Sequence, residues 1–283
     1  MKLQLLGASL AALVALQACA ADPPKPPPPN VDVPDFRTTK ATVTCVDCDA
    51  PFGTITHKEV LDGLATNQYV GELRKALYVQ DSLHQFQSKA HFDNCDFDSA
   101  IAYVDSLYAE AGTHVEAAQV AKAKGDKPGT EAAALKAFFA LGQAMHGVQD
   151  FYAHSNYVEL SKAGVKRTTD LEVVAPWRDA GKVKIAALRQ AGLVSGFVFW
   201  GVPQVCPSGS ISHADLAKDS ETTPSGKVRV PHLENISQYR IAVFLAREAS
   251  LQLMQDAYKR WPLLKEINGP NIVFDVLVDR RGV

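Results

Sequence analysis

The sequence predicts a single all-α domain, and two observations support this prediction. Apolar residues recur at helical spacing in four long segments, a pattern typical of amphipathic helices. At least three of these segments run for about 25 residues or more, a length that favours helices over strands. Residues 272–278 are rich in β-branched side chains, so one short strand or extended tail is expected there. Long helices with so little strand indicate helix-on-helix packing.

The helix boundaries follow from capping and breaking residues. Thr56 and Glu59 form a capping box that begins the first helix. Gly125 ends the second, Thr130 is the expected N-cap of the third, and Pro262 stops the last. The helices are therefore expected at residues 56–85, 97–124, from 130 past 157, at 182–191 and at 233–260.

The N-terminal residues 1–21 read as an export signal. Lys2 is followed by an apolar stretch at residues 3–16 that is too short to span a bilayer comfortably. Residues 16–19, Leu-Gln-Ala-Cys, fit a bacterial lipobox in which Cys19 is lipidated, whereas residues 18–20 fit ordinary signal cleavage. The lipoprotein is the favoured reading. Either reading predicts export from a bacterial cytoplasm, and the lipoprotein would be periplasmic or tethered to the outer membrane.

Residues 22–40 are expected to form a linker. Seven of the 16 prolines fall between positions 23 and 34, and such a segment adopts extended polyproline II rather than packing a core. The helical, metal-binding domain is then expected at residues 41–283.

Four cysteines remain after Cys19, namely Cys45, Cys48, Cys95 and Cys206. An even number in an exported protein favours structural disulfides over a metal site. Three pairings are possible, and all three stay open.

The composition excludes several classes of protein. The chain is 47% hydrophobic and 21% charged, which is ordinary for a globular protein and excludes disorder. A net charge of −2 gives no electrostatic footprint of a dedicated nucleic-acid binder. No G-x-S-x-G motif occurs, which argues against a serine hydrolase of that type.

The strongest chemical signal lies in the third predicted helix. His146, Asp150 and His154 are spaced i, i+4 and i+8, so they fall within an arc of about 80° on one helix face. The backbones of His146 and His154 lie about 12 Å apart along the helix, a gap that one zinc ion with bonds of about 2 Å cannot easily bridge. This spacing predicts at least two ions with Asp150 between them. A hydrogen-bonded polar network without metal is the alternative.

The run from Leu141 to Glu159, which contains these three residues, resembles the signature of the HET-C family. That family is similar to the zinc-dependent phospholipase C and S1/P1 nuclease superfamily. Flanking residues occur in the expected order between about positions 56 and 253: Thr56-His57, Asp81, His91-Phe92-Asp93, Ser212-His213, Lys218-Asp219 and His232.

The resemblance implies a helical fold with a cluster of two to three zinc ions. The implied ligands are Asp81, His91, His146 and Asp150 for the first ion, His154 and His232 with His213 or Asp219 for the second, and His57 with Asp150 for the third. The chain departs from the superfamily in two respects. No Trp follows either cleavage position, and Ile236 stands where a glutamate is expected.

The expected activity is zinc-dependent phosphodiester hydrolysis of the phospholipase C kind. Asp81 is the expected general base or water-orienting residue, and Asp150 is the second catalytic carboxylate. A lipidated Cys19 would place the protein at a membrane and so favours a phospholipid substrate, while the near-neutral charge disfavours nucleic acid. A non-catalytic, metal-stabilised recognition or toxin protein and an S1/P1-like nuclease are the alternatives.

Overall fold

The computed structural model describes residues 68–198 and 204–268. Helices account for 65% of these residues, and their one sheet has two strands, which confirms the all-α prediction. Several predicted features lie outside the described residues: the signal at 1–21 with Cys19, the linker at 22–40, Cys45, Cys48, His57 and the strand at 272–278.

The helices are α2 (Gln68–Leu83), α3 (Phe97–Ala123), α4 (Lys127–His154), α5 (Tyr157–Ser161), α6 (Asp179–Gln190), α7 (His213–Leu216), α8 (Gln238–Arg260) and α9 (Pro262–Asn268). Two 3-10 turns, η1 (Ser88–Ala90) and η2 (Thr168–Asp170), lie between them. Strands β1 (Arg229–Val230) and β2 (Ile236–Ser237) pair antiparallel, with Arg229 opposite Ser237 and Val230 opposite Ile236.

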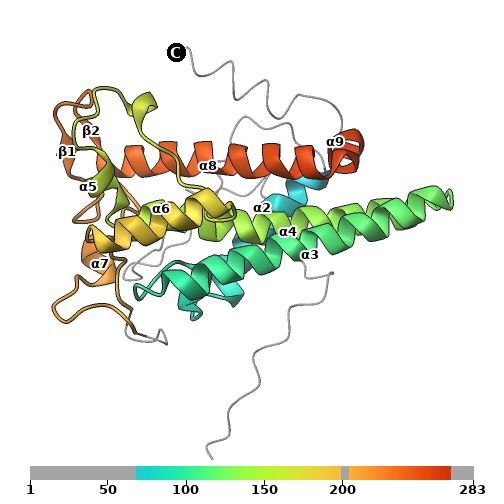
Figure 1. Cartoon of the computed structure of the whole chain (residues 1–283), viewed down its shortest axis with the longest axis horizontal. Coiled ribbons are helices and arrows are strands. Elements are labelled where there is room, and N and C mark those ends of the chain that lie inside the picture. Colours follow the sequence, from blue (N-terminus) through green and yellow to red (C-terminus); the bar gives the residue numbers. More distant parts are fainter. Residues whose placement is uncertain (1–67, 199–203, 269–283) are drawn as a thin grey trace, which may run out of the picture. The chain divides into compact units, whose positions relative to one another are not determined.

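Helix α4 is the centre of this arrangement. It packs against α2, α3 and α8, and Figure 1 shows α3, α4 and α8 running alongside one another. The short elements α5, α7, β1 and β2 gather near one end of α8 (Figure 1). Residues 140–154 of α4 are all buried. The polar side chains on a helix that is covered on every side need hydrogen-bond or metal partners within the protein interior.

Helix α2 approaches α4 closely at Gly142. A Cβ atom at this position would lie 2.7 Å from the Ala76 Cβ and 2.8 Å from the Leu73 carbonyl oxygen. Only a glycine fits at that separation. The close approach brings the end of α2, which carries Asp81, next to the polar face of α4.

The predicted ends of α3 are confirmed to within one residue, but the predicted start of α4 is wrong. Helix α4 begins at Lys127 because the Asp126 side chain caps it, accepting a hydrogen bond from Gly129 N at 3.0 Å. Pro128 occupies the first turn, where its missing N–H removes no helical hydrogen bond. Thr130, the predicted cap, lies inside the helix.

Two further boundaries differ from the prediction. Helix α4 ends at His154 because Ser155 is extended, and Tyr157 begins the separate helix α5. Helix α8 begins at Gln238 rather than 233, because Glu234 and Asn235 have left-handed backbones with φ of 57° and 56°. A helix cannot begin through that conformation, and the next two residues form β2 instead.

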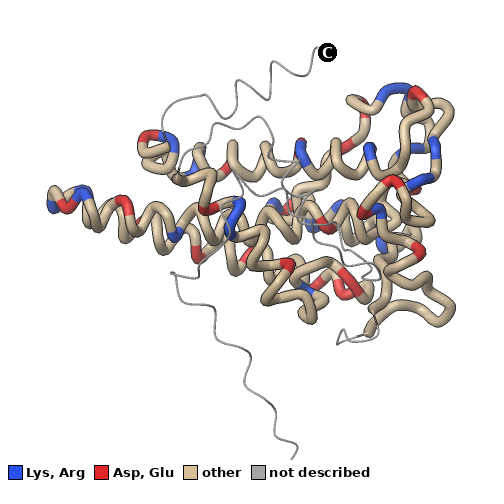
Figure 2. Tube along the Cα trace, turned by 180° about the vertical axis from the view of Figure 1, so that it is seen from behind, with Lys and Arg blue, Asp and Glu red and all other residues tan. Residues whose placement is uncertain are grey.

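Among the described helices, none has both the length and the apolar character that a bilayer span requires. Figure 2 shows basic and acidic residues interspersed over the described trace, as the near-neutral composition suggests.

Candidate metal centre

His146, Asp150 and His154 lie on one face of α4, as the sequence predicted, and all three are buried. The two histidines are 0% exposed and Asp150 is 1% exposed. Two loops and two other helices bring further carboxylates and imidazoles to this face. The result is two neighbouring clusters of metal-binding side chains.

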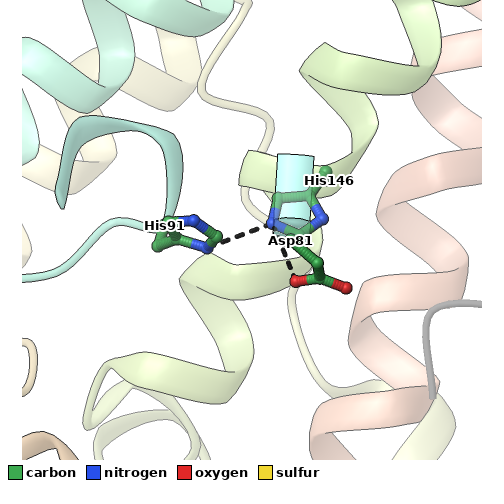
Figure 3. A group of neighbouring side chains, drawn as sticks. All are labelled: Asp81, His91 and His146. Atoms are coloured by element: carbon green, nitrogen blue, oxygen red, sulfur yellow. Dashed lines mark hydrogen bonds and ion pairs between the residues drawn. The ribbon is translucent and has the colours of Figure 1, made fainter. Parts of the chain in front are cut away.

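The first cluster joins three separate elements (Figure 3). Asp81 from α2, His91 from the residue after η1, and His146 from α4 each offer one ligand atom, and these atoms lie within 4.8 Å of one another. His146 Nε2 lies 3.1 Å from His91 Nδ1 and 3.7 Å from Asp81 Oδ1. Asp150 Oδ2 completes the group at 2.8 Å from His91 Nδ1 and 2.9 Å from His146 Nε2.

These separations fit one small metal ion. In a tetrahedral site with bonds of about 2.0–2.1 Å, two ligand atoms lie about 3.3 Å apart. The three atoms His91 Nδ1, His146 Nε2 and Asp150 Oδ2 are separated by 2.8, 2.9 and 3.1 Å, which is close to that value. Asp81 is the natural fourth ligand.

The second cluster consists of Asp93, His154 and His213, whose ligand atoms also lie within 4.8 Å of one another. His213 Nδ1 is 2.9 Å from Asp93 Oδ1, and His154 Nδ1 is 3.5 Å from the same oxygen. Asp219 faces both imidazoles, with Oδ1 at 3.4 Å from His154 Nε2 and Oδ2 at 3.5 Å from His213 Nε2. All four side chains are buried.

Backbone carbonyls orient two of the imidazoles. His154 Nδ1 donates to the carbonyl oxygen of His91 at 2.9 Å, and His91 Nε2 donates to the carbonyl oxygen of His84 at 3.3 Å. A carbonyl can only accept, so in the neutral imidazoles, the form that binds a metal, the lone pairs are on the opposite ring nitrogens, His154 Nε2 and His91 Nδ1. Such outer hydrogen bonds are usual for histidines that bind metals.

The carboxylates of the second cluster attract positive charge. Burial would lower the pKa of His154, but Asp150 and Asp93 outweigh it and raise the pKa to about 9. Burial would likewise lower the pKa of His213, yet Asp93 and Asp219 raise it well above its ordinary value of 6.5. For Asp219, burial would raise the pKa, but His154 and His213 hold it below its ordinary value of 3.8. The cluster is therefore suited to hold a cation.

One loop supplies a ligand to each cluster. His91 faces the first and Asp93 the second, and the loop between them has an unusual backbone. Phe92, Asn94 and Cys95 all have left-handed conformations, with φ of 55°, 60° and 58°. Such conformations cost free energy in residues other than glycine and are typical of functional sites.

Side-chain contacts hold this loop in place. The Phe92 ring packs against the Phe151 ring of α4, with centroids 5.5 Å apart. Asn94 Oδ1 accepts from Val198 N at 2.7 Å. Cys95 forms a disulfide with Cys206, so the structure selects one of the three predicted pairings for these two cysteines.

The segment after residue 194 holds His213 against α4. Gly196 N donates to the carbonyl oxygen of His154 at 2.9 Å, and Gly196 O accepts from Asn94 N at 2.8 Å. A Cβ at Gly196 would lie 2.5 Å from His213 Cα. The glycine therefore permits the close approach that places His213 in the second cluster.

The structure brings together six of the eight predicted metal ligands: Asp81, His91, His146, Asp150, His154 and His213. His57 lies outside the described residues. His232 is exposed and its Nε2 bonds the carbonyl oxygen of Lys162 at 2.9 Å, so the structure does not bring it into either cluster. The reason is the late start of α8, which leaves residue 232 in a loop.

Two carboxylates of the second cluster were not among the eight. The sequence offers Asp93 as a candidate beside His91 and Asp219 as an alternative to His213, without assigning either to a definite site. The two-residue spacing of His91 and Asp93 was the available signal, but only the left-handed turn at Phe92 shows that the two side chains serve different clusters.

A comparison with known protein families gives a match to part of the chain. A family model described as the VWA7 N-terminal domain matches residues 63–183, a segment that contains Asp81, His91, Asp93 and the three site residues of α4 but ends before His213 and Asp219. No curated protein and no solved structure gives a match.

The predicted membership of the HET-C family, and with it of the phospholipase C and S1/P1 nuclease superfamily, is therefore wrong. The short helical run at residues 141–159 does not distinguish that family from others. The chain is similar, over residues 63–183, to the VWA7 N-terminal domain.

Proposed function

We propose that this protein holds two zinc ions and uses them to hydrolyse phosphodiesters. The observation that carries the proposal is the position of Asp150 between the clusters. Its Oδ2 lies 2.8 Å from His91 Nδ1, 2.9 Å from His146 Nε2 and 4.0 Å from His154 Nδ1. Two-metal hydrolases hold their ions about 3.5–4 Å apart, so a carboxylate between two neighbouring sites is well placed to serve both.

The donor set supports zinc and a count of two. Four imidazoles and four carboxylates face the two clusters, and nitrogen with oxygen donors suits zinc. With neutral imidazoles the four carboxylates carry four negative charges, which two divalent cations would balance. The eight residues are His91, His146, His154, His213, Asp81, Asp93, Asp150 and Asp219.

Asp150 and Asp81 would have different roles in hydrolysis. Bound zinc would polarise a phosphoryl oxygen and lower the pKa of a bound water. Asp150, fixed by two imidazoles, would keep the two sites at a constant separation. Asp81 Oδ1 lies 3.7 Å from His146 Nε2, so the carboxylate would bind the first ion through one oxygen and keep the other beside it. Asp81 is therefore the group we assign to receive a proton from the attacking water.

A phospholipid is the substrate that we favour. Nucleic-acid enzymes use basic surfaces to bind the backbone, whereas this chain has a net charge of −2. Lipidation at Cys19 after export would bring the domain to a membrane, where phospholipids are abundant.

Burial supports a second candidate, a protein that uses the ions for stability alone. Structural zinc sites are closed, whereas catalytic sites keep a position open to water or substrate. His146 and Asp150 are nearly inaccessible, and Asp93, His213 and Asp219 are also buried. In this case the metal would stabilise a fold that acts by binding a partner.

Metal analysis and activity assays distinguish these candidates. The purified protein should contain two zinc equivalents by plasma mass spectrometry. It should also hydrolyse a chromogenic phosphodiester and phosphatidylcholine vesicles, but single-stranded DNA more slowly. His146→Ala should abolish the activity, with His114→Ala as the matched control, because His114 is a half-buried histidine on α3 whose Nε2 lies 3.5 Å from Glu110 Oε1. Two bound zinc ions without activity on any of the substrates would favour the structural candidate.

A further inference from the structure

We infer that Lys218 is the positioning residue of the second cluster, an inference that rests on the proposed two-ion centre. Lys218 is one of the largest fully buried side chains in the described part of the chain. It directly precedes Asp219, which faces His154 and His213. A positively charged ammonium group is not a metal ligand, so its burial at this point needs another explanation.

The ammonium group has three N–H donors, and the structure provides three acceptors. Lys218 Nζ lies 2.9 Å from the carbonyl oxygen of Ser155, 3.1 Å from that of Leu216, and 3.0 Å from Glu159 Oε1. Burying an ammonium group is unfavourable unless it is paired and fully hydrogen-bonded. Here both conditions are met.

These contacts enclose His154. The backbone N–H of Lys218 donates to the carbonyl oxygen of Ala153 at 2.9 Å, and its ammonium group reaches the carbonyl oxygen of Ser155. One residue therefore binds the carbonyls on both sides of His154. These carbonyls lie at the C-terminal end of α4, where helical carbonyls lack partners and where a positive charge is favourable.

The same residue also fixes the other ligands. The bond to Leu216 O holds the last residue of α7, the helix that begins with His213. The next residue, Asp219, then presents Oδ1 to His154 Nε2 at 3.4 Å and Oδ2 to His213 Nε2 at 3.5 Å. Lys218 thus ties together the segments that carry all of the second cluster except Asp93.

The first cluster does not depend on Lys218 in this way. Its ligands come from α2, from the loop after η1 and from the middle of α4, whereas Lys218 contacts Ala153, Ser155, Leu216 and Glu159. Loss of the ammonium group should therefore weaken one site selectively. A general loss of folding would affect both sites equally.

The test uses Lys218→Met, which keeps the length of the side chain but removes its three donors. Metal-free protein is titrated with zinc against a chromogenic chelator, and with Co²⁺ while its visible absorption is followed. We expect the second equivalent to bind at least tenfold more weakly than in the wild type and its cobalt spectrum to change. The first equivalent should be unchanged. Lys184→Met is the matched control, because this partly exposed lysine pairs with Glu172 at 2.6 Å and should affect neither site.

Equal binding of both equivalents by Lys218→Met and the wild type would overturn the inference. A wild type that binds fewer than two ions would instead overturn the proposed function. Should Lys218→Met not fold, Glu159→Gln decides the question, because it keeps the ammonium group and removes only the charge of its acceptor. A several-fold weakening confined to the second equivalent is expected, and unchanged binding would overturn the inference.

Discussion

His91 and Asp150 are 59 positions apart in the chain, yet His91 Nδ1 lies 2.8 Å from Asp150 Oδ2. The contact joins the loop after η1 to the middle of α4, and both residues are buried. Because Asp150 also contacts His146 and approaches His154, this one carboxylate links the two clusters.

Replacing Asp150 by asparagine should reduce the zinc content from two ions to one or none. The variant keeps the volume but loses the charge that two sites share. Activity should fall by more than about 100-fold, the upper end of the effect of losing an outer-shell partner of a metal. Zinc content and phosphodiesterase activity measure this directly. Asp170→Asn is the control, since Asp170 pairs with Arg167 at the surface, and unchanged zinc content in Asp150→Asn would contradict the shared site.

Gly142→Ala should destabilise the protein. The added methyl group would lie 2.7 Å from Ala76 Cβ and 2.8 Å from Leu73 O, so α2 must move away from α4. Overpacking of this kind costs about 1–3 kcal/mol in the free energy of unfolding. Gly71→Ala is the matched control on α2, because nothing lies within 4 Å of its added methyl group, and it should stabilise by about 0.5–1 kcal/mol. Urea unfolding of both variants measures these changes. A Gly142→Ala variant as stable as the wild type would show that the contact between α2 and α4 tolerates the added methyl group.

Removal of the Cys95–Cys206 disulfide should lower stability by about 2–4 kcal/mol, since it closes a long loop. The sequence separation of its cysteines is 111. The double variant Cys95→Ser, Cys206→Ser should unfold at lower urea concentration, with or without a chelator. The affinity of the double variant for the second zinc equivalent should also fall, because the disulfide anchors the loop that carries Asp93. An unchanged second equivalent would show that the left-handed loop holds Asp93 without the disulfide.

Asp256 should make stability depend on pH in the acidic range. Burial would raise the pKa of its carboxyl, but hydrogen bonds from Arg178 and Trp177 lower it below its ordinary value of 3.8. The folded state therefore favours the carboxylate. The resulting stability is fully present above the unfolded pKa and is lost as pH falls through the lower, folded pKa.

The comparison of wild type with Asp256→Asn measures this effect. At pH 6 the variant should be less stable by about 1 kcal/mol, a modest value because the pair is partly exposed. The difference should shrink below about pH 4, as the wild-type carboxyl is protonated. A difference that stays constant down to pH 2.5 would exclude ionisation of Asp256 as its source. Chelator is included throughout so that the metal sites do not contribute.

The sequence predicts a helix end correctly where capping and breaking residues near that end determine it. Helix α3 begins after Asp96, whose side chain caps Ser99 N at 3.3 Å, and ends just before Gly125. Helix α8 was predicted too long, because the left-handed backbone of Glu234 and Asn235 has no glycine to mark it. That boundary depends on the pairing of β1 with β2.

The candidate site was predicted only in part for a similar reason. The spacing of His146, Asp150 and His154 along one helix is a local property, and so it was visible in the sequence. The partners of this face come from distant segments, and their choice depends on packing. His232 and Asp219 look equally suitable as ligands in the sequence, yet one bonds Lys162 O and the other faces His154.

The left-handed conformations at Phe92, Asn94 and Cys95 restrict how this protein could be altered. Glycine would relieve the backbone strain at each position, and stabilising substitutions are often found in this way. Here each side chain makes an interaction that glycine would lose. Phe92 packs in the core, Asn94 accepts a hydrogen bond from Val198 N, and Cys95 forms the disulfide. A library selected for heat resistance should therefore retain all three residues, and the loop should be the part of the domain least open to redesign.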